Sequence, residues 1–530
     1  MHEERYMREV KVYDTTLRDG CQGEGISYSV MDKVRIAQAL DDVGVHYIEG
    51  GWPGSNPKDM EFFLSMSKKP LKNAKLAVFS MTRRMNITAE EDTNLKALIK
   101  SQAKVITIVG KTWDLHVKDV LKCSLAENLG MIADTVRFIA SKGLTVFYDA
   151  EHFFDAYKAN PEYSLQCLST AEESGAQVIC LCDTNGGTLP DEIARVIREV
   201  KPRFTASFGI HCHNDSGVAV ANSLAAVEAG AAMVQGTING YGERCGNADL
   251  IPIIVNLQLK MGIRCLGDDK VKDLTKLSHF VSEVSNMTQR TDQPYTGASA
   301  FAHKGGMHIN AVMKNPATYE HVHPEAVGNR RRTLVSELGG KTGILLRAKA
   351  LSLDLKKDDP KTKKILALLQ KLENQGYHFE AAEASLELLI KKALKKYKGF
   401  FELEGFRVVI EKQSDKKITS EAIIKVKVKG VKEHTAAEGD GPVNALDNAL
   451  RKALKDFYPT LSKMHLSDFK VRVLDEKAGT AARVRVLIQS QDQDQVWNTI
   501  GVSENIIEAS WQALVDSVEY KLLKDKAADV

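Results

Sequence analysis

Two histidines flank a cysteine in the segment HCHND, at residues 211–215. The residues before this segment are typical of a buried strand, and side chains on a strand alternate between its two faces. His211 and His213 are therefore expected on one face, with Cys212 on the other. Two imidazoles on one face suit a divalent metal ion, although this spacing is a weak signal when it stands alone.

Candidate oxygen ligands follow two other predicted strands. Asp19 lies in DTTLRDG, after the first strand, and Asn247 lies in GERCGN, after the eighth. In a closed barrel of eight strands the first strand neighbours the eighth, so Asp19, Asn247 and the two histidines would meet at one mouth. Such a site leaves coordination positions open for a bidentate substrate, which favours catalysis over structural metal binding.

Other polar residues also stand at predicted strand ends. Arg18, in the DTTLRDG turn, could stabilise charge on a substrate oxygen, with a structural salt bridge as the alternative. Glu151, with Asp149 near it, could act as a base or bind a substrate hydroxyl. Thr184 offers a hydroxyl to a carboxylate, and Glu49 ends the second predicted strand. We expect Arg18, Glu49 and Thr184 to bind substrate.

These residues need a scaffold that gathers strand ends. Up to about residue 260, eight short runs rich in Val, Ile and aromatic residues alternate with stretches of helical periodicity. Eight strand–helix units in this length predict an α/β fold, a (β/α)8 TIM barrel, whose active sites form at the carboxyl ends of the strands. A doubly wound open sheet is the alternative, but no G-x-G-x-x-G follows the first strand. The predicted strands are residues 10–16, 46–51, 75–80, 105–110, 144–152, 177–184, 208–215 and 233–240.

The composition is that of a soluble globular protein. The 530 residues are 43% hydrophobic and 27% charged, and 72 Lys and Arg against 69 Asp and Glu give a net charge of +3. This near balance argues against nucleic-acid or membrane-surface binding through bulk charge. No apolar run of membrane-spanning length occurs, and the charged N-terminal segment does not resemble a secretory signal, so a cytoplasmic location is expected.

The length predicts more than one domain. We expect a catalytic barrel at residues 1–265, helical subdomains at 266–398 and an α+β regulatory or dimerisation domain at 399–530. The last block shows a weak β-β-α repeat, in which two alternating strands and a helix over residues 406–457 recur over residues 468–523.

Five motifs together resemble one family. The chain is similar to the metal-dependent, Claisen-condensing acyl synthases, which include the isopropylmalate, homocitrate and citramalate synthases. The motifs occur in the family's order and span almost the whole chain. They are DTTLRDG (14–20), HCHND (211–215), NGYGERCGN (239–247), HKGGMH (303–308) and EGDGPVNALDNAL (438–450).

The resemblance implies more than the barrel. It implies that the helical subdomains at 266–398 cover the active site and that the C-terminal domain senses an amino acid. It also implies a homodimer, often swapped so that one subunit's helical subdomain covers the other's active site. The implied cofactor is a divalent metal, and the four ligands named above suit Mn²⁺, Mg²⁺ or Zn²⁺ without selecting one.

The resemblance also implies a reaction between a 2-oxo acid and acetyl-CoA. Arg18 would stabilise the alkoxide that forms on the 2-oxo acid. His308 matches the family's general base, with Glu151 as its acidic partner near the acetyl group. Tyr319 resembles the family's active-site tyrosine, and His303 is a weaker candidate for the base. A histidine suits this proton transfer because its ordinary pKa lies near neutrality.

Within the family, two features favour the citramalate-forming branch. IEGGWPGSNPKD (48–59) resembles that branch, and Cys21 departs from the residues usual in isopropylmalate synthases. The branch condenses pyruvate with acetyl-CoA and water to give (R)-citramalate and CoA in isoleucine biosynthesis, with isoleucine as the expected feedback effector. Isopropylmalate or homocitrate formation is the alternative, because a small alkyl difference in a pocket is worth only about 1–3 kcal/mol. EGDGP could bind the effector carboxylate at a helix N-terminus or form a plain capping turn.

Two rival classes agree less well with the chain. Related lyases and carboxyltransferases share a similar turn and histidine pair, but the lyases lack the HKGGMH segment and the C-terminal repeat. A non-catalytic amino-acid sensor on a degenerate barrel predicts loss of Arg18, Asp19 or the histidine pair, and the chain has all four residues.

Overall fold

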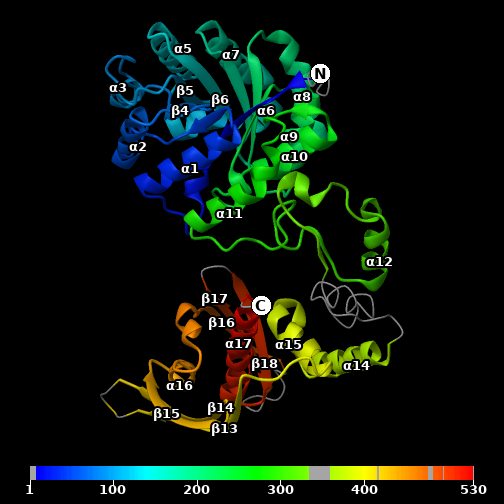
Figure 1. The fold of residues 1–530 in the computed structure, drawn as a ribbon. Coiled ribbons are helices and arrows are strands. Elements are labelled where there is room, and N and C mark those ends of the chain that lie inside the picture. The colour runs from blue at the N-terminus through cyan, green and yellow to red at the C-terminus, as the bar shows by residue number, and fades with distance from the viewer. Residues whose placement is uncertain are drawn as a thin grey trace. The chain divides into compact units, whose positions relative to one another are not determined.

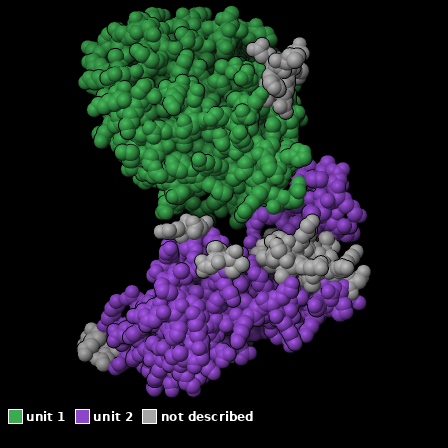
Figure 2. Space-filling model, viewed as in Figure 1, with its two compact units in different colours: residues 1–301, 321–331 green, residues 302–320, 332–530 purple. Residues whose placement is uncertain are grey.

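The structure, a computed structural model, describes residues 8–333, 359–412, 414, 417–474, 482–492 and 495–528. The chain divides into two compact units, residues 1–301 with 321–331 and residues 302–320 with 332–530 (Figure 2). The predicted domain boundaries at residues 265 and 398 stay predictions.

Eight parallel strands close into a barrel in the first unit (Figure 1). Each strand pairs with the next along the chain, and the last pairs with the first, where Tyr13 lies opposite Gln235. The strands match the eight predicted segments, so the predicted TIM barrel is confirmed. They are β2 (Lys11–Asp14), β3 (Tyr47–Glu49), β4 (Lys75–Met81), β5 (Val105–Lys111), β6 (Thr145–Glu151), β7 (Val178–Asp183), β8 (Ser207–Cys212) and β9 (Met233–Gly236).

Helices connect the strands around the barrel (Figure 1). The first helix shows why these segments fold locally: Ser29 and Asp32 form a capping box at its start. Ile36 and Leu40 are buried one turn apart, and Gly44 ends the helix in the left-handed conformation, with φ 92°. The helices of this unit are α1 (Val30–Val43), α2 (Pro57–Ser67), α3 (Thr93–Lys100), α4 (Asp114–His116), α5 (Leu125–Ser141), α6 (Phe153–Ala159), α7 (Pro161–Glu173), α8 (Pro190–Val200), α9 (Ala219–Glu228), α10 (Leu250–Val255) and α11 (Leu274–Val284).

The two faces of the barrel strands have different surroundings. Tyr13, Phe147 and Met233 belong to one buried apolar cluster, built from the strands themselves. Ile210 and Cys212 belong to the main core, which also contains residues of the surrounding helices. This division follows from the two-residue period of a strand and lets His211 on β8 point away from Cys212.

The second unit contains two antiparallel three-stranded sheets, each followed by a helix (Figure 1). None of the helices in the described part of the chain has the length and apolar character of a membrane span. The elements are β13 (Phe401–Glu411), β14 (Thr419–Val428), β15 (Val431–Gly439) and α16 (Pro442–Leu454), then β16 (His465–Val473), β17 (Val484–Gln491), β18 (Val496–Ser503) and α17 (Ile506–Ala528).

The predicted β-β-α repeat is wrong in one respect, because each copy has a third strand. β15 and β18 occupy segments that the sequence analysis treated as loops. β15, with the sequence VKEHTAAEG, has no fully buried residue, and a turn at Lys429 and Gly430 folds it back against β14. An edge strand held mainly by backbone pairing leaves little trace in the apolar pattern. The predicted strand residues 475 and 476 lie outside the described residues.

Shorter elements complete the two units. In the first, β1 (Arg8–Glu9) pairs with β10 (Ile263–Arg264). In the second, β11 (Ala302–His303) pairs with β12 (Arg332–Thr333). In the described part of the second unit, the remaining α-helices are α12 (Gly306–Lys314), α14 (Pro360–Asn374) and α15 (Glu383–Ala393). Residues 334–358, part of the predicted helical subdomains, lie outside the described residues.

Candidate active site

Three predicted metal ligands converge at the carboxyl ends of β2 and β8. His211 lies on β8, His213 follows its last residue, and Asp19 lies in the turn after β2. Asp19 Oδ2 is 3.4 Å from His211 Nε2, and the two imidazole centroids are 5.1 Å apart. One potential ligand atom of each residue lies within 4.8 Å of the others, and all three residues are buried. One cation could therefore contact all three side chains.

Asn247, the fourth predicted ligand, lies beside this cluster. It forms an isolated antiparallel bridge with His213, and its Nδ2 donates to the carbonyl oxygen of Tyr241 at 3.1 Å. Its buried Oδ1 has no hydrogen-bond partner among the residues that the structure describes, and the same holds for Nδ1 of His213. A buried polar atom without a partner is costly, and a bound cation would satisfy the amide oxygen. The donor set thus fits a divalent metal ion.

The charge states of the cluster also suit a metal. Burial lowers the pKa of His211, and burial together with the neighbouring imidazole lowers the pKa of His213 to about 3. Burial opposes ionisation of Asp19, but the Arg18 guanidinium, with a hydrogen bond from Asn247, outweighs burial and lowers the pKa of this carboxyl. Neutral imidazoles and an ionised carboxylate are the forms that bind metal ions.

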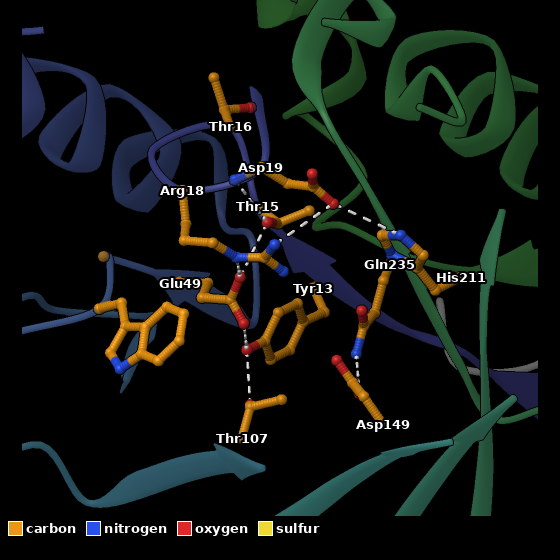
Figure 3. A network of polar contacts seen from close by, with 12 residues as sticks. Tyr13, Thr15, Thr16, Arg18, Asp19, Glu49, Thr107, Asp149, His211 and Gln235 are labelled. Atoms are coloured by element: carbon orange, nitrogen blue, oxygen red, sulfur yellow. Dashed lines mark hydrogen bonds and ion pairs between the residues drawn. The ribbon is translucent and has the colours of Figure 1, made fainter. Parts of the chain in front are cut away.

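Arg18 lies between the metal-ligand cluster and a buried carboxylate (Figure 3). Its Nε donates to Glu49 Oε1 at 2.6 Å, and its Nη1 lies 3.6 Å from Asp19 Oδ2. Its guanidinium carbon lies 4.0 Å from the centroid of the Phe79 ring. A guanidinium held in this way offers its remaining N–H groups from a fixed position, as stabilisation of a developing oxyanion requires.

Glu49 is fully buried, and both of its oxygens accept hydrogen bonds from the protein (Figure 3). Besides Arg18, Thr15 Oγ1 donates to Oε1 at 2.9 Å and Tyr13 Oη donates to Oε2 at 2.6 Å. The Tyr13 hydroxyl is in turn 2.7 Å from that of Thr107. These contacts support a positioning role, in which Glu49 orients Arg18, so substrate binding by Glu49 stays a prediction.

Glu151 and Thr184 line the same cavity as Arg18. This cavity has a volume of about 270 Å³ and is also lined by Asp19 and both ligand histidines. Glu151 Oε2 is ion-paired with the Nζ of Lys111. Thr184 Oγ1 accepts a hydrogen bond from the His152 N–H at 2.9 Å, which leaves its own proton for a substrate oxygen. The structure thus brings these predicted residues to one pocket, while their roles stay predictions.

Sequence reasoning missed several polar residues of this region, among them Lys111 and Gln235. Lys111 is the last residue of β5 and lines the cavity. Gln235, on β9, lies beside His211, and its Nε2 donates to Asp149 Oδ1 at 2.9 Å (Figure 3). Burial raises the pKa of Asp149 to about 7. A search of the predicted strands for polar residues in the inward register would have found Gln235, whereas Lys111 lies one residue beyond the predicted strand at 105–110.

A second group of potential metal ligands lies within the barrel. It consists of Asp149, Cys180 and Cys182, all buried. Burial raises the pKa of the Cys180 thiol well above its usual value, which disfavours the thiolate that binds metals. The Asp149 carboxyl already accepts its hydrogen bond from Gln235. The cluster of Asp19 and the two histidines is therefore the better metal site.

Two predicted catalytic residues belong to the second unit. His308 lies on α12, and its ring centroid is 4.2 Å from that of Tyr319. Both side chains are exposed within the described chain. His303 Nε2 lies 3.1 Å from the buried Glu320 carboxylate. The assignments of His308 and Tyr319 stay predictions.

Comparison with known proteins defines the class first. A family model described as HMGL-like matches residues 9–284, the region of the barrel and its site. One described as homocitrate synthase post-HMGL domain-like matches residues 295–377, and one described as LeuA allosteric (dimerisation) domain matches residues 380–522. The chain therefore combines an HMGL-like TIM barrel with a C-terminal allosteric domain.

Comparison with individual relatives identifies the branch of the family. The chain is 56% identical to the (R)-citramalate synthase of Geobacter sulfurreducens, covering 98% of this chain and 99% of the relative, and 54% identical to that of Aquifex aeolicus, covering 98% of each. It is 31% identical to the 2-isopropylmalate synthase of Methanocaldococcus jannaschii, over 97% of this chain and 95% of the relative. The chain belongs to the (R)-citramalate synthase family, a branch of the Claisen-condensing acyltransferases.

Proposed function

We propose that the protein condenses pyruvate with acetyl-CoA and water to give (R)-citramalate and CoA. The convergence of Asp19, His211 and His213 beside Arg18 in a small cavity carries the proposal, because this set can hold a cation and a 2-oxo acid together. The 56% identity to an (R)-citramalate synthase supports pyruvate as the acceptor. The product would serve isoleucine biosynthesis.

Different barrel residues act on different groups of the 2-oxo acid. A divalent ion, Mn²⁺, Mg²⁺ or Zn²⁺, held by the two imidazoles, Asp19 and Asn247, would polarise the carbonyl as a Lewis acid. Arg18 donates hydrogen bonds to the carbonyl oxygen as that oxygen gains charge, and Glu49 fixes its guanidinium for this purpose. Thr184 donates a hydrogen bond from its hydroxyl to the substrate carboxylate.

The other half of the reaction needs a base for the methyl group of acetyl-CoA. The motif HKGGMH supports His308 in this role, and its ring contact with Tyr319 places a phenol hydroxyl on the same surface. Glu151 is the acidic partner near the acetyl group, and its ion pair with Lys111 fixes the direction of the carboxylate. A histidine can both take up and return a proton near neutral pH.

The choice of acceptor is tested by measuring CoA release with pyruvate, 2-oxobutyrate, 2-oxoisovalerate and 2-oxoglutarate offered separately. Pyruvate should give the highest kcat/KM, by at least about 10-fold over the branched acid, because one methylene is worth about that much and the two acids differ by two carbons. A preference for 2-oxoisovalerate would favour 2-isopropylmalate synthesis, and a preference for 2-oxoglutarate would favour homocitrate synthesis. Either result would contradict the proposed acceptor and keep the condensing chemistry.

The C-terminal domain supports a homodimer with feedback control by isoleucine. It matches a domain described as LeuA allosteric (dimerisation). EGDGP leads into α16, where Gly441 occupies the N-cap position without a side-chain capping bond. The backbone N–H groups of that first turn could bind the effector carboxylate, with the plain capping turn as the alternative.

Isoleucine should inhibit CoA release by the full-length protein and raise its melting temperature. Binding to the folded chain alone stabilises it by about 2.7 kcal/mol at a concentration 100 times the Kd. Leucine and valine are the matched controls, and the mass from light scattering should equal two chains. Inhibition by leucine without isoleucine would reassign the effector, and a monomer would contradict the dimer.

A further inference from the structure

The active-site cavity has polar and apolar linings that suit different parts of a 2-oxo acid. Arg18, Asp19 and the two ligand histidines provide the polar groups. Trp52, Phe79 and Met81 are prominent among the apolar side chains. A substrate whose carbonyl and carboxylate contact the polar groups gains by placing its alkyl group against the apolar ones, away from water. The apolar lining therefore decides which alkyl group fits.

Trp52 contacts its neighbours through both its backbone and its indole ring. Its ring meets that of Phe79 edge-on, with centroids 5.7 Å apart and an interplanar angle of 77°. Its backbone N–H donates to Asp59 Oδ2 at 2.8 Å, and the buried Asp59 is ion-paired with Lys33. Gly51, with φ 142°, allows this approach, because a Cβ there would lie 2.4 Å from the Asp59 carboxylate. The backbone of Trp52 is thus fixed by Asp59, and its indole packs against Phe79 in the wall of the cavity.

A second hollow adjoins the cavity at this residue. It has a volume of about 530 Å³, and Trp52 and Met81 line both spaces. Its further lining is mixed. Met85, Val120 and Leu121 offer apolar surface, and Arg83, Arg84 and Asn94 are polar. Trp52 and Met81 therefore lie on the border between a small active-site cavity and a partly apolar space about twice its size.

We propose that Trp52 is a specificity-determining residue, which limits the acceptor to 2-oxo acids with a small alkyl group by closing the cavity toward the adjoining hollow. The inference rests on the proposed function, in which a 2-oxo acid is the acceptor. A branched alkyl group would have to displace the packed indole, whereas without the indole it would extend into the 530 Å³ hollow. Because packed side chains resist displacement, selectivity then depends on the size of residue 52.

The test compares pyruvate with 2-oxoisovalerate in the unaltered protein and in Trp52→Ala. The ratio of the two kcat/KM values should fall by at least about 10-fold in the variant, since a methylene difference is worth about 10- to 200-fold. Trp52→Phe, which removes only part of the partition, should give a smaller fall. The KM for acetyl-CoA should change little in both. Melting temperatures show which variants fold. If Trp52→Ala does not fold, the ratio measured with Trp52→Phe tests the proposal.

Met85 supplies a matched control, because it lines the hollow and not the cavity. Met85→Ala alone should leave the selectivity unchanged. Adding Met85→Trp to Trp52→Ala should refill the hollow and restore part of the preference for pyruvate, which a merely structural defect at residue 52 would not permit.

An unchanged ratio in folded Trp52→Ala and Trp52→Phe would overturn the inference. A rise in the KM for acetyl-CoA with an unchanged ratio would also overturn it, because Trp52 would then contribute to the binding of acetyl-CoA. If the unaltered protein releases no CoA with any 2-oxo acid, the proposed function itself fails. The two failures are therefore distinguishable.

Discussion

Replacing Asp19 or His211 by alanine should abolish metal-dependent CoA release, with a loss in kcat of more than about 1000-fold. Asp19 Oδ2 and His211 Nε2 lie 3.4 Å apart, and each offers an atom to the same small volume. Loss of the carboxylate removes the charged ligand, and loss of the imidazole leaves His213 as the remaining ring. No other ligand side chain can take the place of Asp19 or His211 unless a barrel strand moves.

The measurement should separate metal binding from chemistry. Calorimetric titration with Mn²⁺ should show weak or no binding to Asp19→Ala and His211→Ala. His308→Ala is the informative comparison, because loss of the proposed base should lower kcat and leave metal affinity intact. His434→Ala, at an exposed position of β15, should change neither quantity. Full activity in either ligand variant would contradict the ligand set.

The barrel could be predicted because its strands carry the signal in their side chains. β5 and β8 are almost entirely buried, so each appears in the sequence as a short run of apolar residues. Closure of eight such strands then places the turn of Asp19 next to His211, although 192 positions separate the two in the chain. Topology alone thus predicted the convergence that the structure shows.

Other features of the site depend on contacts that the spacing of residues along the sequence does not specify. The part of Glu49 in holding Arg18 follows from the donors around it, Tyr13 and Thr15, which look like ordinary strand residues in the sequence. Trp52 lines two adjoining cavities, and its place there depends on Asp59, which binds its backbone, and on Phe79, which packs against its ring. Partners of this kind are set by three-dimensional packing, which a local pattern does not encode.

The third strands of the C-terminal repeat were missed for a related reason. β18 carries Trp497 and Ile500, yet it follows a polar stretch and alternates weakly. Its register is fixed by pairing with β17, where Ser490 lies opposite Trp497. Sequence periodicity detects a strand whose faces differ in polarity, and both missed strands lie at sheet edges.

Arg18→Ala should lower kcat by about 100- to 1000-fold, the usual loss when one donor to a developing oxyanion is removed. Metal affinity should not fall, because the guanidinium lies 3.6 Å from Asp19 and its removal takes a positive charge away from the metal site. Arg18→Lys should recover only part of the rate, since an ammonium cannot reproduce the Nε bond to Glu49 together with N–H groups toward substrate. CoA release and Mn²⁺ titration on the same preparations measure both effects.

Glu49→Gln then decides whether Glu49 acts through Arg18 or on the substrate. If Glu49 only orients Arg18, the variant should lose less than Arg18→Ala, and the double variant should be no slower than Arg18→Ala alone. If Glu49 contacts the substrate itself, the two losses should multiply. Removing Arg18 alone leaves a buried carboxylate without its ion pair, at a cost of about 3–5 kcal/mol in stability, so rates are compared only where the variants are folded. Multiplicative losses would contradict the positioning role, because a residue that acts only through Arg18 has nothing to contribute in its absence.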